Sequence, residues 1–303
     1  MAKKRIVMAI GHKDMGTNLP EQKEADIALA HSGAYRHRSG AVSVVLLAEF
    51  IHCCVDHSYL WCVAVNDGNL PAVLDEVCDH FCSALYGIRA ELIKRGIYKP
   101  VSTVLTQVTV DPYDEAFYTP VKVVGRVMSE EEAKEEEAKG NHVKAVEGGF
   151  RRIVASPHPV AIVEIDAIKA LMDADQIVIA CGGGGIPVME QGYNLRGASA
   201  IIEKDLATGL LAKEIDADVM MILTSVDNVT LNFGTDKEEP IHHMTIDEAK
   251  AYMDQGQFEF ASMLPKVSAS VNFLEAGKGR KAIITSLDKA EESLTGEAGT
   301  TIE

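Results

Sequence analysis

The chain has 303 residues, of which 47% are hydrophobic and 24% are charged, a composition typical of a folded globular protein and not of a disordered one. Its 45 acidic residues outnumber its 29 basic residues, which gives a formal net charge of -16. This balance argues against nucleic acid as the main partner, because a phosphate-binding surface of that kind needs a cluster of basic side chains.

The N-terminal segment begins like an export signal, but its apolar run stops at Ile10, which is too short for the core of a secretory signal. No uninterrupted stretch approaches the roughly 18 apolar residues of a membrane span. We therefore expect a cytoplasmic protein with no membrane contact and with reduced cysteines.

The region that follows has an unusual composition. Five of the six cysteines and half of the ten histidines fall between positions 31 and 82, and no lysine occurs from position 24 to position 93. Residues 26–86 are therefore treated as a separate, anomalous segment.

From residue 100 onward, strands and helices alternate. Ser129, three residues before Glu132, predicts a capping box at the start of a helix that is polar on all sides and should protrude. Apolar strands separated by helices predict a parallel sheet covered on both faces, with ligands at the carboxyl ends of its strands. The predicted elements are strand 100–110, helix 129–140, helix 164–174, strand 176–181, helix 205–215, strand 219–224, helix 245–255, helix 262–276, strand 281–285 and helix 287–294.

Four consecutive glycines, with Gly183 and Gly184 at their centre, follow the predicted strand 176–181. Glycines at a strand exit let backbone amides approach a phosphate closely. A flexible turn is the simpler interpretation. The dinucleotide fingerprint fits poorly, because residues 186–188 open no evident helix, and the lysine of a Walker A loop is missing.

Two lysines fall at predicted helix starts. Lys204 precedes Asp205, and Lys266 directly follows Pro265, a residue favoured near the first helical position. A lysine there adds its charge to a helix N-terminus, where it can contact a transferring phosphoryl group. Asp205 could cap the helix or hold a lysine or Mg²⁺, although a solvated Lys-Asp pair would look the same.

Polar residues Thr224, Ser225 and Asp227 mark the end of the predicted strand 219–224. One such feature alone would carry little weight. Two lysines at helix starts and two polar strand exits should meet at one edge of the sheet, which predicts a site for a phosphate-bearing ligand there.

The motifs FRRIVASPHPVAIVE, GGGGIPV, IIEKDLATGLLAKEIDADVMMILTSVD, SMLPKV, ITSL and GTTI follow Lys122 in this order. Together these motifs resemble the carbamate kinases of the amino-acid kinase family, and the resemblance extends from about residue 87 to the C-terminus. The resemblance implies an α/β fold, a three-layer αβα sandwich with an open, mostly parallel sheet. It also implies one domain over residues 1–303, a protruding subdomain at about 119–157, and a homodimer.

The family reaction is reversible phosphoryl transfer between carbamoyl phosphate and Mg-ADP, which gives ATP and carbamate. The resemblance thus implies ATP or ADP and Mg²⁺ as cofactors, with no metal site built from protein residues. It makes Lys122, Lys204 and Lys266 the catalytic residues. It assigns nucleotide or phosphate contacts to Gly11, Gly183, Gly184, Asp205, Thr224, Ser225, Asp227 and Met263. Alternatives are an amino-acid kinase with another carboxylate substrate, a non-catalytic paralogue that binds nucleotide or a partner, and, more distantly, an NAD enzyme.

The resemblance fails in two places. The family has Gly-Gly-Asn after its first strand, where this chain has Gly11-His12-Lys13, and the family's second glycine-rich loop is absent. Three interpretations of residues 26–86 remain open: natural divergence, a shifted reading frame, or a zinc site using residues such as Cys78 and Cys82. Under a shifted frame the chain would lack a helix–strand–helix layer of its sheet.

Overall fold

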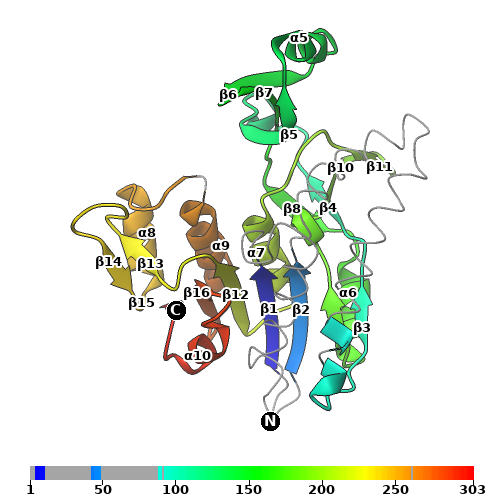
Figure 1. Ribbon diagram of the computed structural model, residues 1–303. Helices are drawn as coiled ribbons and strands as arrows, with labels where there is room; N and C mark the ends of the chain where they lie inside the picture. Colours follow the sequence, from blue (N-terminus) through cyan, green and yellow to red (C-terminus); the bar gives the residue numbers. More distant parts are fainter. Residues whose placement is uncertain (1–3, 11–41, 49–87, 91, 261) are drawn as a thin grey trace.

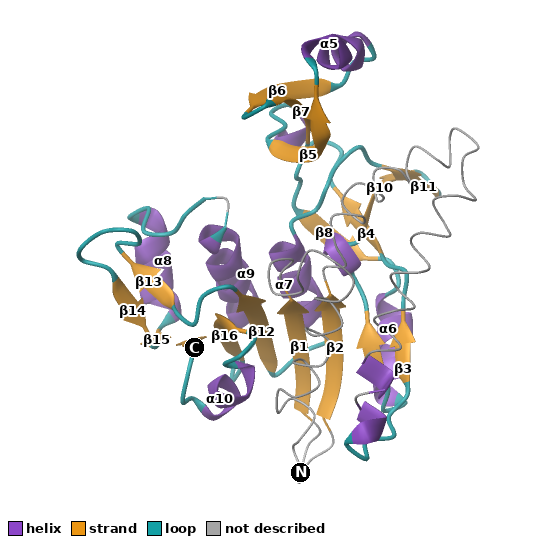
Figure 2. Ribbon diagram, in the orientation of Figure 1, coloured by secondary structure: helices purple, strands orange, loops and turns teal. Residues whose placement is uncertain are grey.

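The computed structural model describes residues 4–10, 42–48, 88–90, 92–260 and 262–303. Its centre is an eight-stranded sheet with the strand order β15-β17-β16-β12-β1-β2-β9-β3, in which only the β16–β17 pairing is antiparallel (Figure 2). In chain order, the strands are β1 (Lys4–Ile10), β2 (Val42–Ala48), β3 (Val101–Thr103), β9 (Ile177–Ile179), β12 (Val219–Thr224), β15 (His243–Met244), β16 (Lys281–Ser286) and β17 (Thr300–Ile302).

Both faces of this sheet are buried. On β12, Met220 and Ile222 belong to the main core cluster, and Met221, which points to the opposite face, is also fully buried. Successive residues of a strand point to opposite faces of the sheet, so consecutive residues are all buried only when both faces are covered. This explains why these strands are continuous apolar runs. The expected α/β fold with a mostly parallel sheet between helical layers is confirmed.

The helices lie close to their predicted positions: α6 (Ile165–Asp173), α7 (Lys204–Glu214), α8 (Ile246–Asp254), α9 (Met263–Glu275) and α10 (Ala290–Thr295). The last helix begins at Ala290 and not at residue 287, because residues 287–289 form a turn in which the Ala290 amide donates to the Leu287 carbonyl. Two short 3-10 helices, η2 (Glu115–Phe117) and η3 (Gly182–Gly184), and the hairpin of β13 (Val229–Leu231) and β14 (Glu239–Ile241) complete this part of the chain.

The prediction of one strand over residues 100–110 is wrong. The chain leaves the central sheet after β3 and joins a second sheet as β4 (Gln107–Val110). Thr106 makes the break: its hydroxyl donates to the Val104 carbonyl at 2.8 Å and accepts from the Cys181 amide at 2.9 Å. The other strands of the second sheet are β8 (Pro159–Ile162), β10 (Ile186–Gln191) and β11 (Asn194–Gly197).

A small antiparallel sheet projects from the body of the molecule (Figure 1). It contains β5 (Lys122–Met128), β6 (His142–Val146) and β7 (Gly149–Val154), with α5 (Glu130–Ala138) at its tip. The predicted capping box is present: the Ser129 hydroxyl accepts from the Glu132 amide at 3.3 Å, and the Glu132 carboxylate accepts from the Ser129 amide at 2.9 Å. These elements lie within the segment 119–157, whose bounds as a subdomain stay a prediction.

The anomalous segment contributes β2 to the central sheet, between β1 and β9. A strand is thus present in this segment, whereas a shifted reading frame would have removed a helix–strand–helix layer of the sheet. The other residues of 26–86, including every candidate zinc ligand, lie outside the described residues. Among the described residues, no helix has both the length and the apolar character needed to cross a membrane.

Candidate active site

The glycine run packs tightly against the chain that leads to Lys204. Gly184 has a φ of +98°, and a Cβ at this position would lie 2.4 Å from the Ile202 carbonyl oxygen. The amides of Gly184 and Gly185 donate to the carbonyls of Cys181 and Gly182, at 2.9 and 3.0 Å. These two amides are therefore engaged within the turn. The strand β10 follows this turn, so no helix opens there, in agreement with the poor match to the dinucleotide fingerprint. Phosphate contacts of Gly183 and Gly184 stay a prediction.

We expect Gly184→Ala to lower the free energy of unfolding by about 2–3 kcal/mol, because it adds both backbone strain and a clash with a carbonyl oxygen. Urea denaturation measures the change. Gly192→Ala is the matched control: Gly192 has a φ of +63°, but no described atom lies within 4 Å of its added Cβ. Equal losses in the two variants would show that the contact with Ile202 contributes nothing.

A buried ion pair lies beside the first turn of α7. The Lys266 ammonium donates to Asp205 Oδ2 at 2.7 Å, and the two residues are only 8% and 1% exposed. The close approach of α7 and α9 brings them together: a Cβ at Gly209 would lie 3.0 Å from the Ala269 carbonyl oxygen. Of the functions proposed for Asp205, the structure shows that it holds a lysine. Asp205 Oδ1 is also buried and accepts no hydrogen bond from any described residue.

A second ion pair involves Glu203, the residue directly before Lys204. Lys122, the first residue of β5, donates to Glu203 Oε2 at 2.5 Å. Glu203 is the N-cap residue of α7, and in the described part of the chain no side chain caps this helix start. The three predicted lysines thus meet around the N-terminus of α7. Glu203 was not predicted, and its only sequence signal is an acidic residue directly before Lys204.

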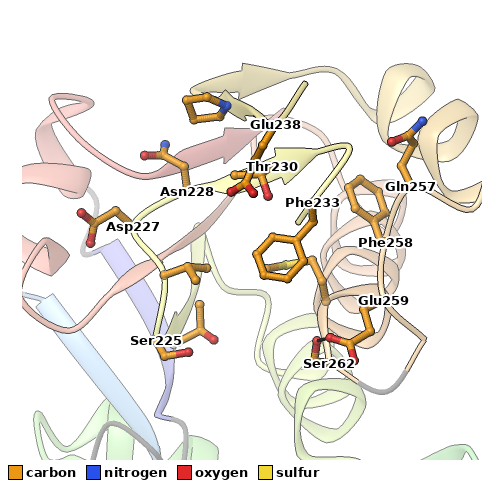
Figure 3. Close-up of a pocket in the computed structure, with 14 residues that line it drawn as sticks. Ser225, Asp227, Asn228, Thr230, Phe233, Glu238, Gln257, Phe258, Glu259 and Ser262 are labelled. Carbon is orange, nitrogen blue, oxygen red and sulfur yellow. Dashed lines mark hydrogen bonds between the residues drawn. The ribbon is translucent and has the colours of Figure 1, made fainter. Parts of the chain in front are cut away.

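A cavity of about 510 Å³ lies next to this cluster, between the end of β12, the β13–β14 hairpin and the start of α9 (Figure 3). Four predicted residues line it: Thr224, Ser225, Asp227 and Met263. Met263 begins α9, the helix that carries Lys266, so the cavity and the ion pairs are joined by one turn of helix.

Sequence reasoning missed the other walls of the cavity. The Phe233 side chain lies between the β12 exit and residues 257–259, and the carboxylates of Glu238 and Glu259 join that of Asp227 around the cavity (Figure 3). Glu259 accepts a hydrogen bond from the Ser262 hydroxyl at 2.7 Å. These residues come from loops, whose positions are set by tertiary packing and not by a local pattern.

The structure says less about the remaining candidate residues. Gly11 lies outside the described residues, although β1 ends one residue earlier at Ile10, which pairs with Leu223. Cys181, which is not among the predicted site residues, is fully buried, and burial raises the pKa of its thiol to about 12, which disfavours the reactive thiolate form. No group of three or more His, Cys, Asp or Glu side chains in the described part of the chain could hold a metal ion.

Comparisons with known proteins agree with this geometry. The family model described as "Amino acid kinase family" matches residues 119–286. A carbamate kinase-like protein of Escherichia coli, YqeA, is 40% identical over 99% of each chain, and a carbamate kinase of Clostridium perfringens is 48% identical over 78% of each chain. The structure of a carbamate kinase from Giardia lamblia bound to AMP-PNP superposes with a TM-score of 0.86 at 32% identity, covering 99% of this chain and 98% of that one. The chain therefore belongs to the amino acid kinase family, as a relative of its carbamate kinases.

Proposed function

We propose that the protein is a phosphotransferase of the carbamate kinase type, which transfers a phosphoryl group between carbamoyl phosphate and ADP to give carbamate and ATP. The observation that carries the proposal is the position of Lys204, at a helix start flanked by the Lys122–Glu203 and Lys266–Asp205 pairs. The relatives named carbamate kinase support this reaction over a different carboxylate acceptor and over a non-catalytic nucleotide-binding role.

The nucleotide would occupy the cavity beside β12. Its volume of about 510 Å³ lies within the usual range for small-molecule sites. Phe233 and Met263 offer an aromatic face and a polarizable thioether to the base, and Ser225 offers a hydroxyl to the sugar. Because Asp227, Glu238 and Glu259 repel phosphates from their part of the cavity, the phosphate chain would run toward α7 and its lysines.

Phosphoryl transfer requires little covalent chemistry from the protein. The bond between phosphorus and the carbamoyl oxygen breaks while a bond to a β-phosphate oxygen of ADP forms, and the protein positions both partners and neutralises the charge. Lys204 would act together with the amide groups of the first turn of α7, where negative charge is favoured. Lys122 would approach from β5, and Asp205 would fix the direction of Lys266.

Magnesium would enter with the nucleotide, as Mg-ADP, and phosphate oxygens would supply much of its coordination. The homodimer and the cytoplasmic location stay predictions from the sequence.

Purified protein is expected to form ATP from carbamoyl phosphate and Mg-ADP. Mg-ADP alone should stabilise the native state, by about 2.7 kcal/mol at a hundredfold excess over its Kd, and so raise the melting temperature. A coupled assay and a thermal shift measure the two effects. An unchanged melting temperature in millimolar Mg-ADP would contradict the proposed nucleotide site.

The cavity can be tested separately. Phe233→Ala should weaken Mg-ADP binding by about five- to tenfold, through the loss of one aromatic contact. Tyr193→Ala removes another exposed aromatic ring, from the turn between β10 and β11 outside the cavity, and should leave the affinity unchanged.

A further inference from the structure

The projecting sheet is joined directly to the chain that leads into Lys204. The Ile201 amide donates to the Ala155 carbonyl at 2.9 Å. Ile201 also forms a small core with Val124 of β5 and Val154 of β7, in which each residue is at most 5% exposed. These contacts fix the base of the projecting sheet, so that Lys122, two residues before Val124, stands over the start of α7.

The two ion pairs beside Lys204 differ in burial. The side chains of Lys266 and Asp205 are 11% and 2% exposed, whereas those of Lys122 and Glu203 are 37% and 20% exposed. Separating the first pair would leave a charge buried without compensation, so that pair should persist through the reaction. The second pair is partly exposed to water, so its side chains can exchange partners at a lower cost than those of the buried pair.

We infer that Glu203 is a positioning residue, which holds the Lys122 ammonium at the start of α7 in the empty site and releases it to the phosphate group of the substrate. The inference rests on the proposed function, since it takes phosphate as the incoming anion. Glu203 competes with that anion for the same ammonium and repels it as a like charge. It thereby keeps Lys122 oriented while the site is empty, and it weakens the binding of the ground-state anion.

A double-mutant cycle with inorganic phosphate as the probe tests this competition. Phosphate binding is measured by calorimetry for the wild type, Glu203→Gln, Lys122→Met and the double variant. Glu203→Gln should tighten phosphate binding by about two- to fivefold, the upper part of the range expected when a solvent-accessible ion pair is removed as a competitor. In the Lys122→Met background the same change should have a much smaller effect, because no ammonium remains to be released.

A matched control removes the same charge elsewhere on the projecting unit. Glu130 pairs with Lys134 at 2.7 Å on the exposed surface of α5, and Glu130→Gln should leave phosphate affinity unchanged. Steady-state kinetics adds a second readout: Glu203→Gln should lower the KM for carbamoyl phosphate and also lower kcat, since Lys122 is less well oriented. A purely structural role would change the melting temperature and neither constant.

Three results would overturn the inference. Phosphate binding that is weaker or unchanged in Glu203→Gln would show that the carboxylate does not compete with the anion. Tightening of equal size in the Lys122→Met background would assign the effect to charge repulsion alone. A large fall in melting temperature would show that the pair is a structural tether. If the wild type forms no ATP, the proposed function fails, but the phosphate cycle still decides the role of Glu203.

Discussion

Replacing Lys204 with alanine should reduce turnover by about 10²- to 10³-fold, the effect of removing one preorganised group that stabilises charge in a transition state. Lys204 is the first residue of α7, where its charge adds to the positive end of the helix dipole. It is only partly buried, so the free energy of unfolding should stay within about 0.5 kcal/mol of the wild type. Steady-state kinetics and urea denaturation measure the two quantities.

Lys213→Ala is the matched control, since Lys213 lies in the last turn of the same helix. Its loss removes a favourable interaction with the helix C-terminus, about 0.3–1 kcal/mol, and should leave turnover unchanged. Lys204→Ala should therefore lose turnover and keep its stability, whereas Lys213→Ala should lose some stability and keep its turnover. Full activity of Lys204→Ala would remove this lysine from the mechanism, and with it the main support for the proposed reaction.

The elements that were predicted correctly are those whose formation depends only on residues close together in the sequence. The capping box of α5 needs only Ser129 and Glu132, and β12 needs only an apolar run long enough for a buried strand. The strand over residues 100–110 failed because its break depends on Thr106, whose hydroxyl bonds Cys181, 75 residues away. No local pattern around Thr106 encodes that partner.

The same distinction applies to the site. Lys204, Lys266 and Thr224 could be placed from sequence, because helix starts and strand ends meet at one edge of a parallel sheet. Glu203 could not, since its partner Lys122 lies 81 residues earlier, on a sheet whose docking is set by packing around Ile201. The resemblance named the lysines, and the structure adds the carboxylate partner of two of them, Glu203 for Lys122 and Asp205 for Lys266.

Lys266→Met should lower the free energy of unfolding by about 3–5 kcal/mol, the largest stability effect that we expect from one substitution in the site. Methionine fills nearly the same volume, so lost packing contributes little. The effect arises because Asp205, which is 1% exposed, would be left as an uncompensated charge with both oxygens lacking a donor among the described residues. Turnover should also fall, since the variant has lost one of the three lysines.

The double variant Lys266→Met/Asp205→Val separates the two effects. Replacing a buried ion pair with apolar residues of comparable size is often neutral or stabilising, so the double variant should recover most of the unfolding free energy lost by Lys266→Met. Its turnover should stay low, because no ammonium returns to the site. Urea midpoints and m-values for the wild type, both single variants and the double variant complete the cycle. If Lys266→Met alone loses less than about 1 kcal/mol, Asp205 finds another partner or water, and the pair does not fix the direction of Lys266.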